Sequence, residues 1–190
     1  MKGNLAANNK SIVMTAFFAA IVFLGIQMFR IPMPAAVGTP FLHFGHIFVV
    51  LAILCMGGRR AAFSGTLGLI IFDILNGYFH AIPNVFVCTI IKCLIAGAVF
   101  AILKRRAGGG LKKEYKAAII VTIVYGLLNI ITDFAWNTAE LVLLGSSLPA
   151  ALIAEISSIP ATIINAVFAV IGIAVLYVPV SAAYKRIVNE

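Results

Sequence analysis

Charged residues are scarce in this chain, and acidic ones are the scarcest. Its 190 residues include six Asp and Glu against 14 Lys and Arg, while hydrophobic residues make up 63% and the mean hydropathy is +1.11. Soluble domains are typically about 45–50% apolar, so the composition excludes a soluble globular protein and predicts an integral membrane protein. The basic residues gather in short connections instead of along one face, which excludes a nucleic-acid-binding stripe.

Motifs for nucleotide binding and metal catalysis are also absent. The chain has no GxGxxG, Walker A, HExxH or CxxC pattern. An enzyme acting on lipid or isoprenoid substrates would need clustered acids near the cytoplasmic face, and the chain has none there. We find no internal repeat of the kind that many self-sufficient transporters contain. We therefore expect neither an enzyme nor a protein with its own cofactor.

Cysteine and histidine are too few and too dispersed to suggest a disulfide framework or a metal site. The three cysteines, Cys55, Cys88 and Cys93, lie within apolar runs, as buried free thiols do. The three histidines lie near predicted outer connections, and no acid or cysteine joins them at ligand spacing. They are His43, His46 and His80. The sequence therefore predicts no bound metal.

Long apolar runs are present instead, and they predict an all-α bundle of six transmembrane helices in a single domain covering residues 1–190. A helical span needs about 20 apolar residues. The predicted spans are approximately 11–29, 44–56, 61–77, 85–103, 117–144 and 150–177, with a kink expected at Pro160. Lys and Arg concentrate at both termini and in the second and fourth connections, whereas the other connections hold only Arg30. The positive-inside rule then places both termini in the cytoplasm.

The amide and charged residues within the spans fall in the outer half of the membrane. On the fifth span they recur at steps of three and four and so share one helix face. These residues are Asn129, Asp133, Asn137 and Glu140, with Trp136 on the same face, and neighbouring spans add Lys92, Glu155 and Asn165 at similar depth. A charged group at membrane depth costs about 2.5 kcal/mol or more, so it seldom faces lipid. The sequence therefore predicts a substrate-binding pocket that opens outward above an apolar floor.

Several short motifs follow one another along the chain. They are Ala16-x-x-x-Ala20, Ile31-Pro-Met-Pro34, His43-Phe-Gly-His46, Phe72-Asp-Ile-Leu-Asn-Gly-Tyr78 and Thr89-Ile-Ile-Lys92. With the small size and the predicted topology, they resemble the substrate-binding S components of energy-coupling factor (ECF) vitamin transporters, in the branch grouped with riboflavin, hydroxymethylpyrimidine and pyridoxine.

The resemblance implies a multi-pass protein of a bacterial plasma membrane that binds a vitamin at the outer side. Such a subunit docks on a transmembrane coupling subunit, which two cytoplasmic ATPases drive, and it topples to deliver the ligand. By resemblance, Ala16 and Ala20 form the docking face, because small side chains let helices approach closely. Without the resemblance, packing inside the bundle explains this pair of alanines equally well.

The predicted ligand is a small heteroaromatic B vitamin or precursor of the pyridoxine or hydroxymethylpyrimidine type, with riboflavin as the alternative. Trp136, Asp133 and Asn137 are expected to stack on its ring and form hydrogen bonds with it. In the alternative interpretation, Trp136 belongs to an interfacial aromatic belt. The competing class is a self-sufficient channel or carrier, which would move its ligand without a partner.

Two sets of charged residues allow more than one interpretation. Asp73 and Lys92 lie at compatible depth on adjacent spans, so we expect a structural ion pair, with a ligand contact by Lys92 as the alternative. Glu140 and Glu155 are either pocket residues or solvated acids. As pocket residues they would favour a neutral or cationic ligand that is rich in hydrogen-bond donors.

The first connection, residues 30–43, contains three prolines and a glycine, which preclude a regular helix. It is either a lid over the pocket or a linker. Its length and apolar content favour the lid.

Overall fold

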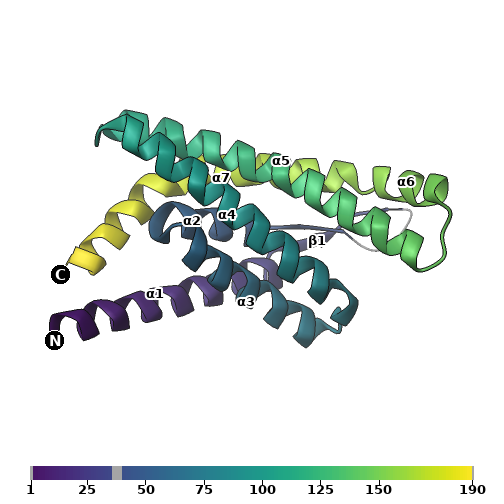
Figure 1. Cartoon of the computed structure of the whole chain (residues 1–190), viewed down its shortest axis with the longest axis horizontal. Coiled ribbons are helices and arrows are strands. Elements are labelled where there is room, and N and C mark those ends of the chain that lie inside the picture. Colours follow the sequence, from purple (N-terminus) through teal and green to yellow (C-terminus); the bar gives the residue numbers. More distant parts are fainter. Residues whose placement is uncertain (1, 36–39, 190) are drawn as a thin grey trace.

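A computed structural model of the chain, which describes residues 2–35 and 40–189, is built almost entirely of α-helices (Figure 1). The helical prediction is confirmed, and a pair of short strands is an addition to it. In the described part the elements are, in order, α1 (Lys2–Gln27), β1 (Arg30–Pro32), β2 (Phe41–His43), α2 (Gly45–Met56), α3 (Gly58–Asn76), the 3₁₀ turn η1 (Phe79–Ala81), α4 (Ile82–Ala107), α5 (Leu111–Leu143), α6 (Leu148–Ile156) and α7 (Ile159–Asn189).

Four helical stretches of the described residues are long and apolar enough to cross a membrane: Asn9–Gln27, Phe79–Ala107, Leu111–Leu143 and Ile159–Val188. Helix α2 is apolar but shorter, at 12 residues. Helix α3 begins with Arg59 and Arg60 within its first turn. The chain is therefore a multi-pass helical membrane protein.

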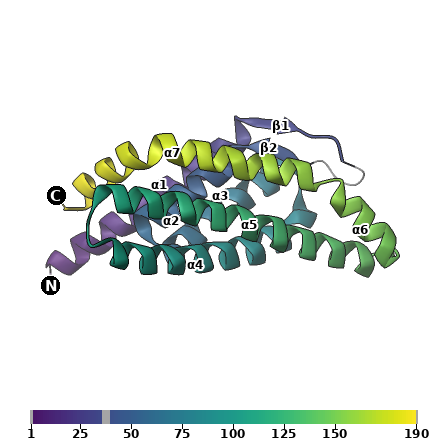
Figure 2. The same ribbon diagram turned by 90° about the horizontal axis from the view of Figure 1, so that it is seen from above.

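The sixth predicted span, 150–177, is two helices in the structure. Helix α6 ends at Ile156 and α7 begins at Ile159. In a continuous helix Pro160 would clash with the carbonyl of Ile156 and would have no N–H to donate to it. At the start of a new helix the missing N–H needs no partner. The prediction of one kinked span was therefore wrong, and α6 is a separate short helix at the end of the molecule opposite the termini (Figure 2).

Strands β1 and β2 form an antiparallel pair in the register Arg30↔His43, Ile31↔Leu42 and Pro32↔Phe41. A proline biases the residue before it towards extended backbone, and the Ile-Pro-Met-Pro sequence applies this bias twice. The N–H of Met33 donates to the carbonyl of Pro40 at 2.8 Å, which extends the pairing. The segment predicted as a lid therefore starts and ends in this strand pair, while its residues 36–39 lie outside the described part.

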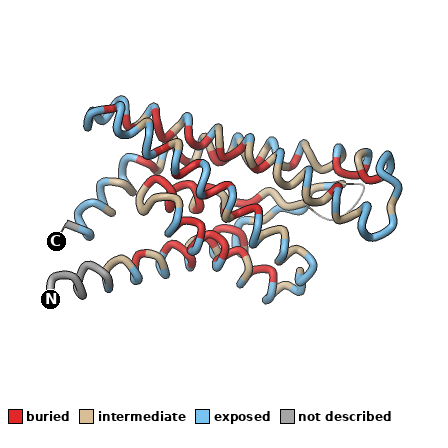
Figure 3. Tube along the Cα trace, in the orientation of Figure 1, coloured by how far each residue is buried: buried red, intermediate tan, exposed pale blue. Residues whose placement is uncertain are grey.

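Glycines allow the helices to approach one another closely. A Cβ atom added to Gly97 of α4 would lie 2.4 Å from the Cα of Gly58 on α3. One added to Gly68 of α3 would lie 2.5 Å from the carbonyl oxygen of Ala19 on α1. In a membrane, where lipid tails are as apolar as leucine, such close packing drives helix association. Buried residues lie between the helices and exposed ones lie outside them (Figure 3).

Both termini lie at one end of the molecule, and α6 lies at the other (Figures 1 and 2). The connection between α4 and α5, which carries Lys104, Arg105 and Arg106 before it, lies at the end with the termini. The strand pair and η1 lie towards the end with α6. The molecule thus has a basic end and an opposite end where irregular segments meet.

Candidate functional site

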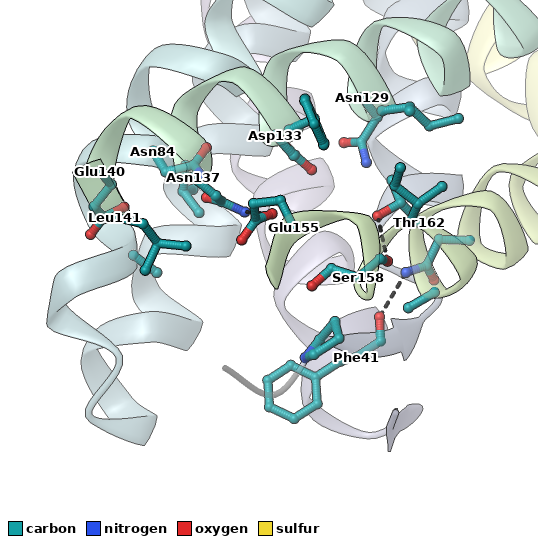
Figure 4. Close-up of a pocket in the computed structure, with 18 of the residues that line it drawn as sticks. Phe41, Asn84, Asn129, Asp133, Asn137, Glu140, Leu141, Glu155, Ser158 and Thr162 are labelled. Carbon is teal, nitrogen blue, oxygen red and sulfur yellow. Dashed lines mark hydrogen bonds between the residues drawn. The ribbon is translucent and has the colours of Figure 1, made fainter. Parts of the chain in front are cut away.

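A cavity of about 450 Å³ lies towards the α6 end of the molecule. Its wall combines β2, η1, the beginning of α4, the second half of α5, α6 and the beginning of α7 (Figure 4). Small-molecule sites typically have volumes of roughly 300–1,000 Å³ and combine apolar walls with a few polar groups. The polar side chains of this wall, apart from the histidines, are Asn84, Asn129, Asp133, Asn137, Glu140, Glu155, Ser158, Thr162 and Asn165.

A hydrogen-bond network of amide and carboxylate groups joins three helices across the wall. The Nδ2 of Asn84 on α4 donates to the Oδ1 of Asn137 on α5 at 2.7 Å. The Nδ2 of Asn137 in turn donates to the Oε2 of Glu155 on α6 at 3.1 Å. Because each of these two hydrogen bonds joins two helices, together they fix α6 against α4 and α5.

Glu155 is the most buried acid of the wall, with an exposed fraction of 6%. Burial raises the pKa of its carboxyl, and the neighbouring Asp133 and Glu140 carboxylates raise it further, against the opposing hydrogen bond from Asn137. The protonated and ionised forms of Glu155 are therefore closer in free energy than in a solvated glutamate.

Lys92 of α4 approaches the cavity from behind its wall. Its Nζ donates to the Oδ1 of Asn129 at 2.6 Å and to the Oδ1 of Asp133 at 3.2 Å. Lys92 is buried, whereas the side chain of Asp133 is 30% exposed and lines the cavity. Asn129 and Asp133 lie one helical turn apart on α5, so one ammonium group reaches both. Lys92 thus neutralises a carboxylate of the wall without lining the cavity itself.

The expected ion pair between Asp73 and Lys92 was wrong. Lys92 pairs with Asp133, and the buried Oδ2 of Asp73 has no hydrogen-bond partner among the described residues. Helix α4 packs against both α3 and α5. Sequence distance gives the depth of a side chain but leaves open which neighbouring helix it faces, and Lys92 faces α5.

Asn165 of α7 holds strand β2 in place at the cavity. Its Oδ1 accepts a hydrogen bond from the backbone N–H of His43 at 2.9 Å. Its Nδ2 donates to the backbone carbonyl of Phe41 at 2.6 Å. The side chain lines the cavity, but one of its two N–H donors and one acceptor position are already used by the strand.

Two histidines line the inner side of the cavity near Asn165. The rings of His43 and His46 lie 4.6 Å apart, and the Nδ1 of His46 lies 3.2 Å from the hydroxyl of Tyr125. The N–H of Gly45 donates to the Nδ1 of His43 at 3.1 Å. Burial, with a smaller contribution from the Lys92 ammonium, lowers the pKa of His43 from 6.5 to about 4. His43 is therefore neutral near pH 7 and adds no positive charge to the wall.

Two of the predicted site residues do not line the cavity: Lys92 and Trp136. Trp136 is half-buried and lies at the edge of the polar face of α5, one step of three from Asp133. The other predicted residues, which the structure brings together in one wall, are Asn129, Asp133, Asn137, Glu140, Glu155 and Asn165. The phenyl rings in the wall belong to Phe41 and Phe134.

Asn84, Ser158 and Thr162 also line the cavity, and none of them is among the predicted substrate-binding residues. Each of the three lies at a helical spacing from a polar residue that the sequence does predict. Asn84 lies eight residues before Lys92, which places the two on one face of α4 after two turns. Ser158 and Thr162 precede Asn165 at steps of four and three. Following the helix face of each predicted polar residue for one or two further turns identifies them.

Ala16 and Ala20 lie on an outer face of α1, far along the chain from the cavity residues. Both are exposed, together with Phe17 between them. The buried residues of this helix, such as Phe18 and Val22, face the bundle instead. The two methyl groups therefore do not pack within the described part of the chain.

Comparison with known families gives one match that covers nearly the whole chain. A family model described as ECF-type riboflavin transporter, S component, matches residues 6–186. Among curated proteins, no sequence matches the chain.

Proposed function

The chain belongs to the S-component family of ECF-type riboflavin transporters, and we propose that it captures a small heteroaromatic B vitamin or precursor from the outer side of the membrane. The family is one of vitamin-binding transporter subunits and not of enzymes. The ligand proposed is of the pyridoxine or hydroxymethylpyrimidine type, and riboflavin is the alternative that the family description itself supplies.

The observation that carries this proposal is the position of the cavity. Its polar groups gather at the end of the molecule opposite both termini, and the core beyond them is apolar. We place the basic end in the cytoplasm by the positive-inside rule. Helices α1 to α5 and α7 then make six crossings, with both termini inside and α6 as an outer helix. In this arrangement the cavity faces outward and the ligand enters without crossing the membrane.

The residues proposed to contact the ligand are those that line the wall: Asp133, Asn137, Glu140, Glu155, Asn129 and Asn165. Lys92 holds Asp133 and Asn129 from behind. Trp136 is proposed as a neighbour of the site whose fluorescence reports on it, because the chain contains no other tryptophan. Phe41 and Phe134 supply the aromatic surface on which a heteroaromatic ring packs.

Delivery of the ligand then requires partners. We assign the exposed Ala16 and Ala20 face of α1 to docking on a transmembrane coupling subunit, and ATP hydrolysis to two cytoplasmic ATPases. The small side chains would let a partner helix approach closely. With an ECF coupling module, a bulky Ala20→Trp substitution is expected to abolish uptake while leaving binding unchanged. Ile123→Trp, on an exposed face of α5, serves as the matched control and should retain uptake.

Calorimetric titration of the purified chain with a panel of B vitamins and their precursors tests the capture function. We expect one member to bind, and Asp133→Asn to weaken that binding. Glu114→Gln is the control, because Glu114 is a buried acid at the opposite end of the molecule, where it pairs with Lys185. Absence of binding by every member of the panel would overturn the proposal.

A further inference from the structure

We infer that the cavity selects a cationic ligand, one that carries a protonated amine, an amidinium-like group or a quaternary nitrogen, over a neutral ligand of the same shape. This inference rests on the proposed function and specifies the chemistry of its substrate. The observations that carry it are the charge balance of the wall and the excess of free hydrogen-bond acceptors over free amide donors.

Negative charge exceeds positive charge in the wall. Three carboxylates line the cavity, those of Asp133, Glu140 and Glu155, and no Lys or Arg side chain of the described residues does so. The buried Lys92 lies behind the wall and is engaged by Asp133. Formally, one ammonium group offsets one of three carboxylates. The remaining two have no cationic partner among the described residues.

The oxygens of these two acids remain available to a ligand. The Oε2 of Glu155 accepts one hydrogen bond from Asn137, and no other bond to this carboxylate is formed within the described part. The carboxylate of Glu140 forms neither a hydrogen bond nor an ion pair there. Both side chains line the cavity, Glu155 among the other polar groups and Glu140 at the edge (Figure 4). Removing a carboxylate from water without a partner is costly, and a bound cation would supply that partner.

The amide groups of the wall, by contrast, are partly engaged, because each Nδ2 carries two N–H donors and three of the four groups already use one of them. The Nδ2 groups of Asn84, Asn137 and Asn165 each donate to an oxygen of the protein. Asn129 retains a free Nδ2 in the described structure, since only its Oδ1 is bonded. Accessible acceptors therefore outnumber accessible amide donors. A neutral ligand rich in carbonyl acceptors, such as an isoalloxazine ring, would leave the carboxylates without a cationic partner, whereas a ligand that presents N–H donors and a positive charge would supply one.

The aromatic residues of the wall fit the same ligand. Phe41 and Phe134 line the cavity beside the acids, and the ring of Phe41 is already in contact with the Arg30 guanidinium, 5.5 Å from its centroid, so Phe134 offers the freer face. A phenyl face attracts both a cation and a flat aromatic ring. The wall thus combines a surface for a heteroaromatic ring with carboxylates for a charged substituent.

A matched pair of ligands isolates the charge. Pyridoxamine and pyridoxine share one ring and differ in an ammonium group in place of a hydroxyl. We expect the purified chain in lipid nanodiscs, titrated by calorimetry at pH 7.5, to bind pyridoxamine at least about tenfold more tightly, the value of one charge-assisted hydrogen bond. Thiamine, a cation, and riboflavin, which is neutral, extend the comparison to other rings.

Substitution of the acids tests the cause of the preference. Glu155→Gln keeps the size and the acceptor for Asn137 but removes the charge, and we expect it to reduce the preference for pyridoxamine by about tenfold to a hundredfold. Glu140→Gln, in a more exposed position, should reduce it less. Glu114→Gln, at the opposite end of the molecule, should leave it unchanged. A melting curve for each variant shows that it remains folded.

The outcomes separate this inference from the proposed function. Equal or tighter binding of pyridoxine, or tight binding of riboflavin without binding of any cation, would overturn the inference and leave vitamin capture standing. A preference for the cation that survives in both Glu155→Gln and Glu140→Gln would also overturn it. If no member of the panel binds, both the inference and the proposed function fail.

Discussion

Lys92 and Asp133 show how one buried cation shapes the cavity wall. The ammonium group of Lys92 is almost fully buried and reaches both Asp133 and Asn129. Its removal would leave a carboxylate without its counter-ion in a partly buried site. The pair therefore serves two purposes, because it stabilises α4 against α5 and sets the charge that a ligand meets.

We predict that Lys92→Met destabilises the protein and that a second change restores part of the loss. Removing one partner of a buried ion pair typically costs roughly 3–5 kcal/mol, and the partial exposure of Asp133 places the expected loss at the lower end of that range. Lys92→Met/Asp133→Asn should melt at a higher temperature than Lys92→Met alone. The measurement is thermal unfolding in detergent, and a double variant that is no more stable than the single one would contradict the assigned pair.

A second prediction concerns the pH dependence of binding through Glu155. Burial raises the pKa of this carboxyl, so it takes up a proton at a higher pH than a solvated glutamate does. Below the raised pKa the group is neutral and offers no charge to a cation. Affinity for a probe with a quaternary nitrogen, whose charge does not change with pH, should therefore fall as the pH is lowered through this pKa.

Calorimetry between pH 7.5 and pH 4.5 measures this dependence. In Glu155→Gln the acidic fall in affinity should be much smaller, because the titrating group is gone. A fall of the same size in that variant would assign the pH dependence to another group.

At this scale the sequence predicted most of the amide and carboxylate residues of the wall, but not the ion pair behind it. The steps of three and four on α5 brought together Asn129, Asp133, Asn137 and Glu140, because helical periodicity alone determines which residues share a face. The partner of Lys92 depends on which of two neighbouring helices it faces. Which neighbour it faces depends on the rotation of α4 about its own axis. Tertiary packing sets this rotation, and the sequence of a single helix does not determine it.

Among the elements, strand β2 is hydrogen-bonded to α7 by the side chain of Asn165. Asn165 bonds both the N–H of His43 and the carbonyl of Phe41. We predict that Asn165→Leu increases amide hydrogen exchange in residues 41–43 by about tenfold or more, since each lost hydrogen bond is worth about 1 kcal/mol. Thr162→Val, which changes another cavity residue of α7, should leave this exchange unchanged.

Hydrogen exchange followed by mass spectrometry resolves this segment from the helices. Unchanged protection of residues 41–43 in Asn165→Leu would contradict the anchoring role. Ligand dissociation is expected to become faster in the same variant, because β2 forms part of the cavity wall.

The contact between α3 and α4 supports a second prediction at this scale. A Cβ atom on Gly97 would lie 2.4 Å from the Cα of Gly58, so Gly97→Ala must push the two helices apart. Overpacking of this kind typically costs roughly 1–3 kcal/mol. The control is Gly110→Ala, since a Cβ there would lie 3.7 Å from its nearest neighbour at an ordinary backbone conformation. Thermal unfolding should separate the two variants, and equal stability would contradict the close crossing.

The helices themselves were predictable, whereas the breaks between them were less so. Apolar run length located α1 and the helices around 85–103 and 117–144, because a membrane leaves few alternatives to a helix. A proline within an apolar run permits either a kink or a division into two helices, so the sequence alone does not separate α6 from α7. The pairing of β1 with β2 depends on partners 9 to 13 residues apart in the chain and on Asn165, which local patterns do not reveal.

For the whole molecule, the central feature is the separation of its two ends. The cavity, with its acids and amides, lies at one end, while the termini and the basic connection between α4 and α5 lie at the other. A ligand bound in this cavity has the apolar core between it and the basic end. Capture and release into the cell are therefore expected to be separate events, of which this chain performs the first.

Transport by the chain alone in liposomes tests this account most directly. Purified protein is reconstituted, and a radiolabelled ligand identified by calorimetry is followed both as bound ligand and as ligand within the lumen. We predict saturable binding without accumulation in the lumen, and accumulation only after a coupling subunit, its two ATPases and ATP are added. Saturable accumulation by the chain alone, abolished by Asp133→Asn, would contradict the account and identify a self-sufficient carrier.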